Sequence, residues 1–230
     1  MAALTPRHPG ALSPHAQALL GRLAERPWSD DFYLAGSAAL ALYTGHRPVR
    51  DLDLMAGTNR LTSPERRDLL GDLLALEPAT EVETARDGYL YVRVAGEAIQ
   101  GTGIRFFYYP YPLADPFQEF AGFPVISAVD LGLMKLGAII SRGTRRDFVD
   151  LYMLCRELPL AGLLERADDK FGHVRDFPLQ ALKGLADLSV AAEDPMPCLA
   201  LPLEWEEVES WVLGQVRDLG RSRFGMEALP

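Results

Sequence analysis

Apolar residues follow two different periods in the first half of the chain. In some segments they recur every three or four residues, which predicts helices, and in others they alternate with polar residues, which predicts strands. Asp87-Gly88 is a hairpin signal between two of the strands. The predicted helices are 12–26, 37–44 and about 63–76, and the predicted strands are 32–35, 50–55, 80–86, 89–95 and 103–109.

The second half carries helical periodicity almost throughout. Prolines interrupt residues 108–116, which cannot form regular structure. We therefore predict an α+β domain over 1–115 and a helical bundle over 116–230, with the helical region completing the active-site cleft. The helices predicted there are 128–140, 144–157 and segments near 159–170, 178–191 and 204–219.

Composition narrows the choice of protein class. The 230 residues are 48% hydrophobic and 24% charged, which is typical of a folded globular protein, and the net charge of −9 argues against general nucleic-acid affinity. Cys155 and Cys198 form neither a disulfide framework nor a zinc motif. With no apolar run of membrane-spanning length and no apolar leader, we expect a cytoplasmic monomer that does not contact a membrane.

Asp51 and Asp53 are the first candidates for chemistry. They lie two apart on a predicted strand, so both carboxylates point to the same face. Two adjacent carboxylates repel each other unless a cation lies between them, and hard oxygen ligands favour Mg²⁺ or Mn²⁺. The alternative is a solvated acidic face that forms ion pairs with Arg47 and Arg50.

Gly36-Ser37 occupies a predicted strand-to-helix turn upstream of the acidic pair. Glycine allows close approach of a phosphate, and the helix N-terminus offers free N–H groups and the positive end of its dipole. The alternative is a serine that caps the helix. Together with Asp51 and Asp53, the turn predicts a phosphate cradle beside a metal site.

A lysine and an arginine-aspartate cluster are the candidates in the helical half. Lys135 is the only central charge of an apolar helix, so it either extends to solvent or contacts an anion. Asp147 and Asp150 are three apart and share a helix face, with Arg142 and Arg146 close by in sequence. The alternative is a structural Arg–Asp network.

Three stretches resemble a known family. They are YLAGSAALALYTGHRPVRDLDLM (33–55), YPYP (109–112) and SAVDLGLMKLGAIISRGTRRDFVDLYML (127–154). They are similar to the AbiEii/AbiGii-type toxin nucleotidyltransferases of the DNA polymerase β-like superfamily. The resemblance implies a mixed sheet with flanking helices, an NTP substrate and a divalent metal ion.

The resemblance also implies roles by position in the first half. Gly36 and Ser37 would hold the nucleotide triphosphate, and Arg47 would support nucleotide binding. Asp51 and Asp53 would bind the metal and act in catalysis.

In the second half, Lys135 would contact phosphate and Asp150 would be a further catalytic acid. Asp147, Arg146 and Arg142 would be accessory residues.

The chain departs from the family pattern in three places. It has Ala35-Gly36-Ser37 where two glycines are usual, and Val49 where a small hydroxyl residue is frequent. The superfamily also has a third carboxylate on a later strand, whereas the only charge in strand 103–109 is Arg105. Either Asp150 replaces that carboxylate or the metal site is incomplete.

These observations favour transfer of a nucleoside monophosphate from an NTP to an acceptor hydroxyl. The resemblance implies RNA, in particular the tRNA 3′ end, as acceptor, a toxin role and a cognate antitoxin. Arg142, Arg145 and Arg146 form the best local basic patch for RNA. Two alternatives remain: transfer to a small molecule or protein side chain, and a nucleotide-binding module with a degenerate site.

Overall fold

The computed structural model of the protein describes residues 4–95 and 101–225, which form two compact units. The first unit holds the residues up to 112 together with 116–127, and the second holds 113–115 and the residues from 128 onward. The division therefore differs from the predicted boundary between 115 and 116, because the chain returns to the first unit for two more strands.

A mixed sheet is the frame of the first unit. Among the described residues it has seven strands in the order β3-β4-β5-β2-β1-β7-β6. β5 is parallel to β2 and β7 is parallel to β1, while the other neighbours are antiparallel. The strands are β1 (Tyr33–Ala35), β2 (Leu52–Ala56), β3 (Glu81–Arg86), β4 (Tyr89–Val94), β5 (Thr102–Tyr108), β6 (Gln118–Phe120) and β7 (Phe123–Val125).

The helices of the first unit agree with the sequence pattern. They are α1 (Pro14–Ala24), α2 (Gly36–Thr44) and α3 (Ser63–Leu76), with two short 3₁₀ turns at Pro9–Ala11 and Ser29–Asp31. α2 ends where Gly45 adopts a φ of 63°, a left-handed conformation that favours glycine. The strands β6 and β7 were not predicted, because β6 (Gln-Glu-Phe) lacks the continuous apolar run that revealed the equally short β1, and Pro124 interrupts β7.

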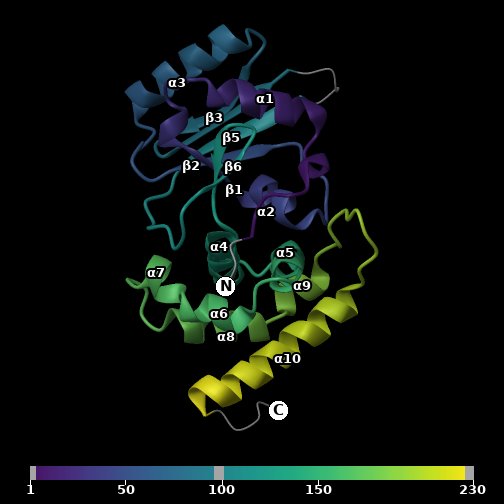
Figure 1. Ribbon diagram of the computed structural model, residues 1–230. Helices are drawn as coiled ribbons and strands as arrows, with labels where there is room; N and C mark the ends of the chain where they lie inside the picture. The colour runs from purple at the N-terminus through teal and green to yellow at the C-terminus, as the bar shows by residue number, and fades with distance from the viewer. Residues whose placement is uncertain (1–3, 96–100, 226–230) are drawn as a thin grey trace. The chain divides into compact units, whose positions relative to one another are not determined.

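Aromatic residues anchor the helices on one face of this sheet. The rings of Trp28, Phe32 and Phe106 meet edge to face, with centroids 5.2–5.8 Å apart. The Trp28 indole N–H also donates to Asp72 of α3, at 2.8 Å, so the segment that follows α1 is tied to α3; Figure 1 labels both helices. Each such ring pair adds roughly 0.5–1.5 kcal/mol beyond area burial. The opposite face is only partly buried.

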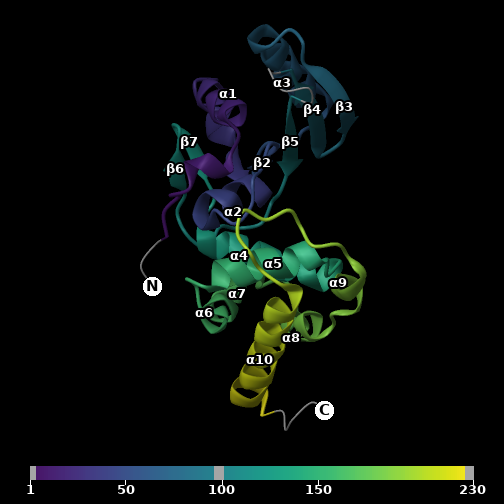
Figure 2. The same ribbon diagram turned by 90° about the vertical axis from the view of Figure 1, so that its right-hand side faces the viewer.

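The second unit is a helical bundle, as predicted. Among its described residues, α4 packs on α5 and α8, and α10 packs on α5 and α8; Figure 2 shows α10 beside α8. The helices are α4 (Ala128–Ser141), α5 (Arg145–Cys155), α6 (Leu160–Glu165), α7 (Ala167–Phe171), α8 (Phe177–Ala186), α9 (Ser189–Glu193) and α10 (Trp205–Phe224). In the part of the chain that the structure describes, none of the helices is both long and apolar enough to cross a membrane.

A buried ion pair ties residues 113–115 to this bundle. Asp130 of α4 accepts hydrogen bonds from the backbone N–H groups of Ala114 and Asp115, at 3.0 and 3.2 Å. Lys170 of α7 donates to the same carboxylate at 2.8 Å, and neither charged side chain is exposed to solvent. Arg166 adds a bond to the Ala114 carbonyl. Because each buried charge is compensated, the crossing segment is held without an unpaired ion.

Candidate active site

Asp51 and Asp53 lie on one face at the start of β2, and one arginine bridges them. The Nη2 atom of Arg105 lies 2.6 Å from Oδ2 of Asp51, and its Nη1 atom lies 3.3 Å from Oδ1 of Asp53. The strand ladder explains this contact, since Arg105 on β5 pairs in register with Asp53. Asp51 precedes the first residue of β2 and accepts a bond from the Gly103 N–H at 3.1 Å. The predicted common face is therefore observed, with Arg105 as the bridging arginine.

The Gly-Ser turn meets the acidic pair directly. Gly36 begins α2 with a φ of 57°, and a Cβ atom there would lie 2.3 Å from Oδ2 of Asp53. Only glycine fits such an approach. The backbone N–H of Ser37 donates to the same Oδ2 atom at 3.4 Å. A single hydrogen bond therefore connects the N-terminus of α2 to the Asp53 carboxylate.

Arg47 supports the turn from the other end of α2. Its Nη2 atom donates to the Ser37 hydroxyl at 2.8 Å, and the residue is only 7% exposed. The neighbouring His46 is fully buried, with Nδ1 2.6 Å from the hydroxyl of Thr44. A buried guanidinium beside a helix N-terminus adds positive charge where a phosphate would bind.

The charge balance of this cluster leaves room for a cation. Burial raises the pKa of Asp53, while the charge and hydrogen bond of Arg105 and the Ser37 N–H oppose that shift. Two carboxylates face one guanidinium, so the ionised cluster of these three groups keeps a net negative charge.

The donor set fits a metal ion that is shared with a substrate. Among the described residues no group of three or more His, Cys, Asp or Glu side chains is arranged to hold a metal ion. Mg²⁺ is frequently held by one or two carboxylates together with substrate phosphates, and Asp51 and Asp53 provide that pair. Because Gly36 has no Cβ, the Asp53 carboxylate lies directly against the turn. β5 contributes no carboxylate to this set, and Arg105 is its one charged residue.

Lys135, Asp147 and Asp150 form a separate buried cluster in the second unit. The Lys135 Nζ atom lies 2.7 Å from Oδ2 of Asp150 and 3.2 Å from Oδ1 of Asp147. Arg142 forms a two-point bond to Asp147, at 2.7 and 2.8 Å. Burial raises the pKa of Asp147, but the bonds from Arg142 and Thr144 and the charge of Lys135 outweigh it and lower the pKa to about 2. Both aspartates are fully buried, so the anionic partner predicted for Lys135 includes the chain's own carboxylates.

Only part of the predicted basic patch of Arg142, Arg145 and Arg146 is available to an external ligand. Arg145 is used within the bundle, because it donates to the carbonyl oxygens of Ala191 and Ala192 and stacks over the Trp205 ring at 4.8 Å. Arg142 and the exposed Arg146 line a pocket of about 450 Å³.

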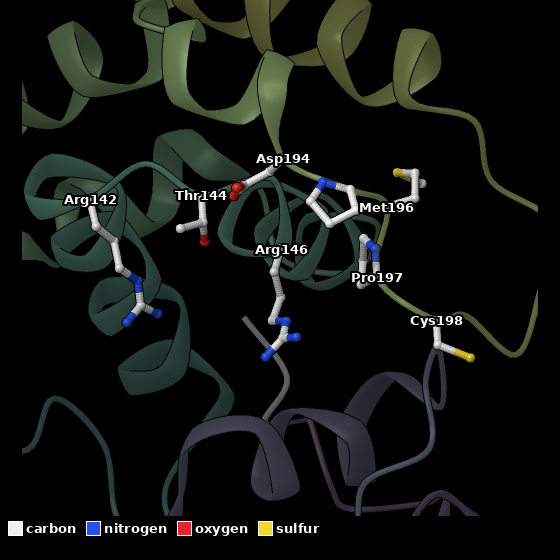
Figure 3. Close-up of a pocket in the computed structure, with 8 residues that line it drawn as sticks. Arg142, Thr144, Arg146, Asp194, Met196, Pro197 and Cys198 are labelled. Atoms are coloured by element: carbon white, nitrogen blue, oxygen red, sulfur yellow. The ribbon is translucent and has the colours of Figure 1, made fainter.

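Figure 3 shows the Arg142 and Arg146 side chains extending in the same direction, with Thr144 between them. Asp194 and the segment Pro195–Cys198 complete the lining of this pocket. It offers two guanidinium groups and one carboxylate.

Sequence reasoning missed the partly exposed face of the sheet next to the acidic pair. Tyr89 and Tyr91 alternate with buried residues along β4, and Phe107 packs against Tyr89 with centroids 5.0 Å apart. Arg86 lies over the Tyr89 ring at 5.1 Å and Arg105 over the Tyr91 ring at 4.8 Å. The alternation of YLYVRV was the available signal, but only the ladder shows that these side chains share the Arg105 face.

Comparison with known proteins agrees with this geometry. The model of the family described as "Nucleotidyl transferase AbiEii toxin, Type IV TA system" matches residues 17–218. An uncharacterized protein of Aquifex aeolicus (strain VF5) is 28% identical over 197 residues, covering 82% of this chain and 88% of its own length.

Two solved structures share the fold. JHP933 from Helicobacter pylori matches with a TM-score of 0.53 at 18% identity, covering 93% of this chain and 95% of its own. MenT4, a nucleotidyltransferase toxin of Mycobacterium tuberculosis H37Rv, matches with a TM-score of 0.51 at 15% identity, covering 90% and 86%. The mixed sheet with flanking helices is the polymerase β-like nucleotidyltransferase fold.

Proposed function

The chain belongs to the AbiEii nucleotidyltransferase toxin family of type IV toxin–antitoxin systems, and we propose that it transfers a nucleoside monophosphate from an NTP to the 3′ hydroxyl of an RNA, with tRNA as the leading acceptor. The observation that carries this proposal is the bond between the Ser37 N–H and the Asp53 carboxylate. It joins an anion-binding helix end to an acidic pair, which is what a metal-bound triphosphate requires.

Each residue then has a role that follows from its contacts. Asp51 and Asp53 would hold Mg²⁺ or Mn²⁺, and an ion there would supply charge stabilisation on the phosphates. Ser37 would donate its N–H and hydroxyl to phosphate oxygens. Arg47, which already holds that hydroxyl, would fix its direction. Gly36, which has no Cβ, lets the turn lie against the Asp53 carboxylate.

Lys135 and Asp150 are proposed to act as a pair. An ammonium group has three donors, and within the described residues Asp147 and Asp150 account for two of them, so we assign the third to a phosphate oxygen. Asp150 is fully buried and lies 2.7 Å from Lys135. We therefore propose that Asp150 positions the lysine and does not itself contact the metal.

The partly exposed sheet face supports an RNA acceptor. Aromatic rings next to arginines bind single-stranded nucleic acid by stacking and charge, and Tyr89, Phe107 and Arg86 supply both. Such a local surface can hold RNA although the whole chain carries a charge of −9.

Transfer of label from each NTP labelled at its α-phosphate tests the activity. With Mg²⁺ and tRNA, we expect label on RNA with one or few of the NTPs and no label when the tRNA 3′ diol has been oxidised with periodate. Asp51→Ala and Asp53→Asn should reduce transfer at least about a hundredfold, the order of loss for a group that stabilises transition-state charge. Asp68→Asn, an exposed carboxylate on α3, is the matched control and should retain transfer.

One observation favours a second candidate, a nucleotide-binding module without transfer. β5 carries Arg105 and no carboxylate, so it lacks the third acidic residue that the family resemblance leads us to expect on a later strand. A thermal shift with NTP and Mg²⁺ but no labelled RNA, protein or small molecule would support this candidate. Label on protein would instead indicate a side-chain acceptor.

The family assignment also leads us to propose a cognate antitoxin. Expression of the chain should arrest growth in a manner that Asp53→Asn abolishes. A neighbouring gene product that restores growth and co-purifies with the wild-type chain would be that partner.

A further inference from the structure

Arg105 occupies the position between Asp51 and Asp53 that a bound divalent cation would require. One of its nitrogen atoms contacts each carboxylate, at 2.6 and 3.3 Å. A planar guanidinium can reach two carboxylates at once, whereas an ammonium group is a point charge. The chain thus supplies its own cation to the acidic pair.

A second layer of contacts holds this arginine in place. Its guanidinium lies 4.8 Å from the centre of the Tyr91 ring, which is its register neighbour on β4. The Tyr91 hydroxyl accepts a bond from Arg93 at 2.6 Å, and Arg93 pairs with Glu83 at 2.8 Å. The hydrogen bond to its hydroxyl therefore holds the Tyr91 ring in place beside Arg105.

A metal ion and this guanidinium compete for the same two carboxylates. Mg²⁺ requires its oxygen ligands at about 2.0–2.1 Å, and a positive charge beside it would oppose binding. A metal ion that binds at the oxygen atoms held by Arg105 must therefore displace the guanidinium from them. All three side chains are partly exposed, at 31% for Arg105, 30% for Asp51 and 16% for Asp53. Replacing the guanidinium with a metal ion therefore does not expose buried core residues.

We propose that Arg105 is an internal competitor for the divalent cation, which lowers metal affinity until the triphosphate brings further oxygen ligands. This inference rests on the proposed function, in that Asp51 and Asp53 are taken as the metal ligands. It makes Arg105 a positioning residue, because it acts through the carboxylates. Its consequence is that metal alone binds weakly to the wild-type chain.

The test is a titration of the full chain with Mn²⁺ alone, in which electron paramagnetic resonance measures free Mn²⁺. We expect Arg105→Gln to bind Mn²⁺ about tenfold more tightly than wild type, which corresponds to about 1.4 kcal/mol. Arg105→Lys keeps the charge but loses the bridge, so its affinity should fall between the two. Arg105→Gln should also show a larger rise in unfolding temperature on addition of Mn²⁺.

Arg67→Gln is the matched control. It removes one positive charge from the same unit at an exposed position of α3. Its Mn²⁺ affinity should stay within about twofold of wild type if the Arg105 bridge, rather than the net charge of the unit, lowers metal affinity. Equal gains in affinity for Arg67→Gln and Arg105→Gln would overturn the proposal.

The remaining outcomes separate this proposal from the proposed function. If Asp51→Asn abolishes Mn²⁺ binding but Arg105→Gln does not tighten it, Arg105 is no competitor while the metal site stands. If no variant shows Mn²⁺ binding that depends on Asp51, the metal site and the competitor role fail together. Should Arg105→Gln fail to fold, the comparison of Arg105→Lys with wild type decides, because equal affinities would contradict competition.

Discussion

Asp147 has more compensating contacts than a surface carboxylate, and its substitution should be costly. It accepts hydrogen bonds from Lys135, Arg142 and Thr144 and has no exposed area. These partners lower its pKa from 3.8 to about 2. At 1.36 kcal/mol per pKa unit, its ionised form contributes about 2 kcal/mol to the free energy of unfolding at neutral pH. We expect Asp147→Asn to lose about that amount, and Asp147→Ala about 3 kcal/mol, because it also leaves the buried Lys135 with one carboxylate partner instead of two.

The pH dependence of the loss follows from the direction of the shift. A carboxyl group whose pKa is lower in the folded state stabilises the fold above its unfolded pKa. That contribution disappears as the pH falls from about 4 through about 2. The stability difference between wild type and Asp147→Asn should therefore be constant from pH 7 to pH 5 and shrink markedly at pH 3.

Urea unfolding followed by tryptophan fluorescence measures this difference. Trp205 is a suitable reporter, since its ring packs on Phe148, the residue next to Asp147. Asp218→Asn, an exposed carboxylate on α10, is the control and should change stability by less than about 0.5 kcal/mol. A loss below 1 kcal/mol for Asp147→Asn, or a difference that does not shrink in acid, would refute the electrostatic account.

Three further predictions concern other parts of the chain. Lys170→Met should cost about 3 kcal/mol in urea unfolding, because it leaves the Asp130 carboxylate charged and buried. Gly36→Ala should abolish the thermal shift produced by NTP and Mg²⁺, since its Cβ would lie 2.3 Å from an Asp53 oxygen and its φ of 57° is unfavourable by about 1–2 kcal/mol for other residues. Burial raises the pKa of Cys155 to about 12, so a thiol reagent should label only the exposed second cysteine rapidly and reach Cys155 on unfolding.

Local patterns were sufficient to predict the acidic pair and its turn. Alternation along a strand puts Asp51 and Asp53 on the same face, and a glycine before a short helix marks the anion-binding end. Both features depend on neighbours within a few residues. They could therefore be predicted from the sequence alone.

Contacts between distant strands could not be predicted in this way. Arg105 meets Asp53 because β5 pairs in parallel with β2, and the partners are 52 residues apart in sequence. The sequence alternative named Arg47 and Arg50, which are closer along the chain. β6 and β7 were missed for a related reason: neither has a continuous apolar run, so only their partners define them as strands.

The two charged clusters of the chain resemble each other in composition but differ in exposure. Each has two aspartates: Arg105 pairs with both in the first unit, and Lys135 with both in the second, where Arg142 also pairs with Asp147. In the second cluster the carboxylates have no exposed area, so exchanging a cation would require desolvated charges to separate, at a cost of several kcal/mol per ion. In the first, Asp51 keeps 30% of its side-chain area in contact with solvent, and water can compensate the carboxylates while the arginine leaves. Solvent exposure therefore determines which cluster can exchange its internal cation for a metal ion. The exposed pair Asp51 and Asp53 can do so, whereas the buried cluster of Lys135, Asp147 and Asp150 stabilises the fold.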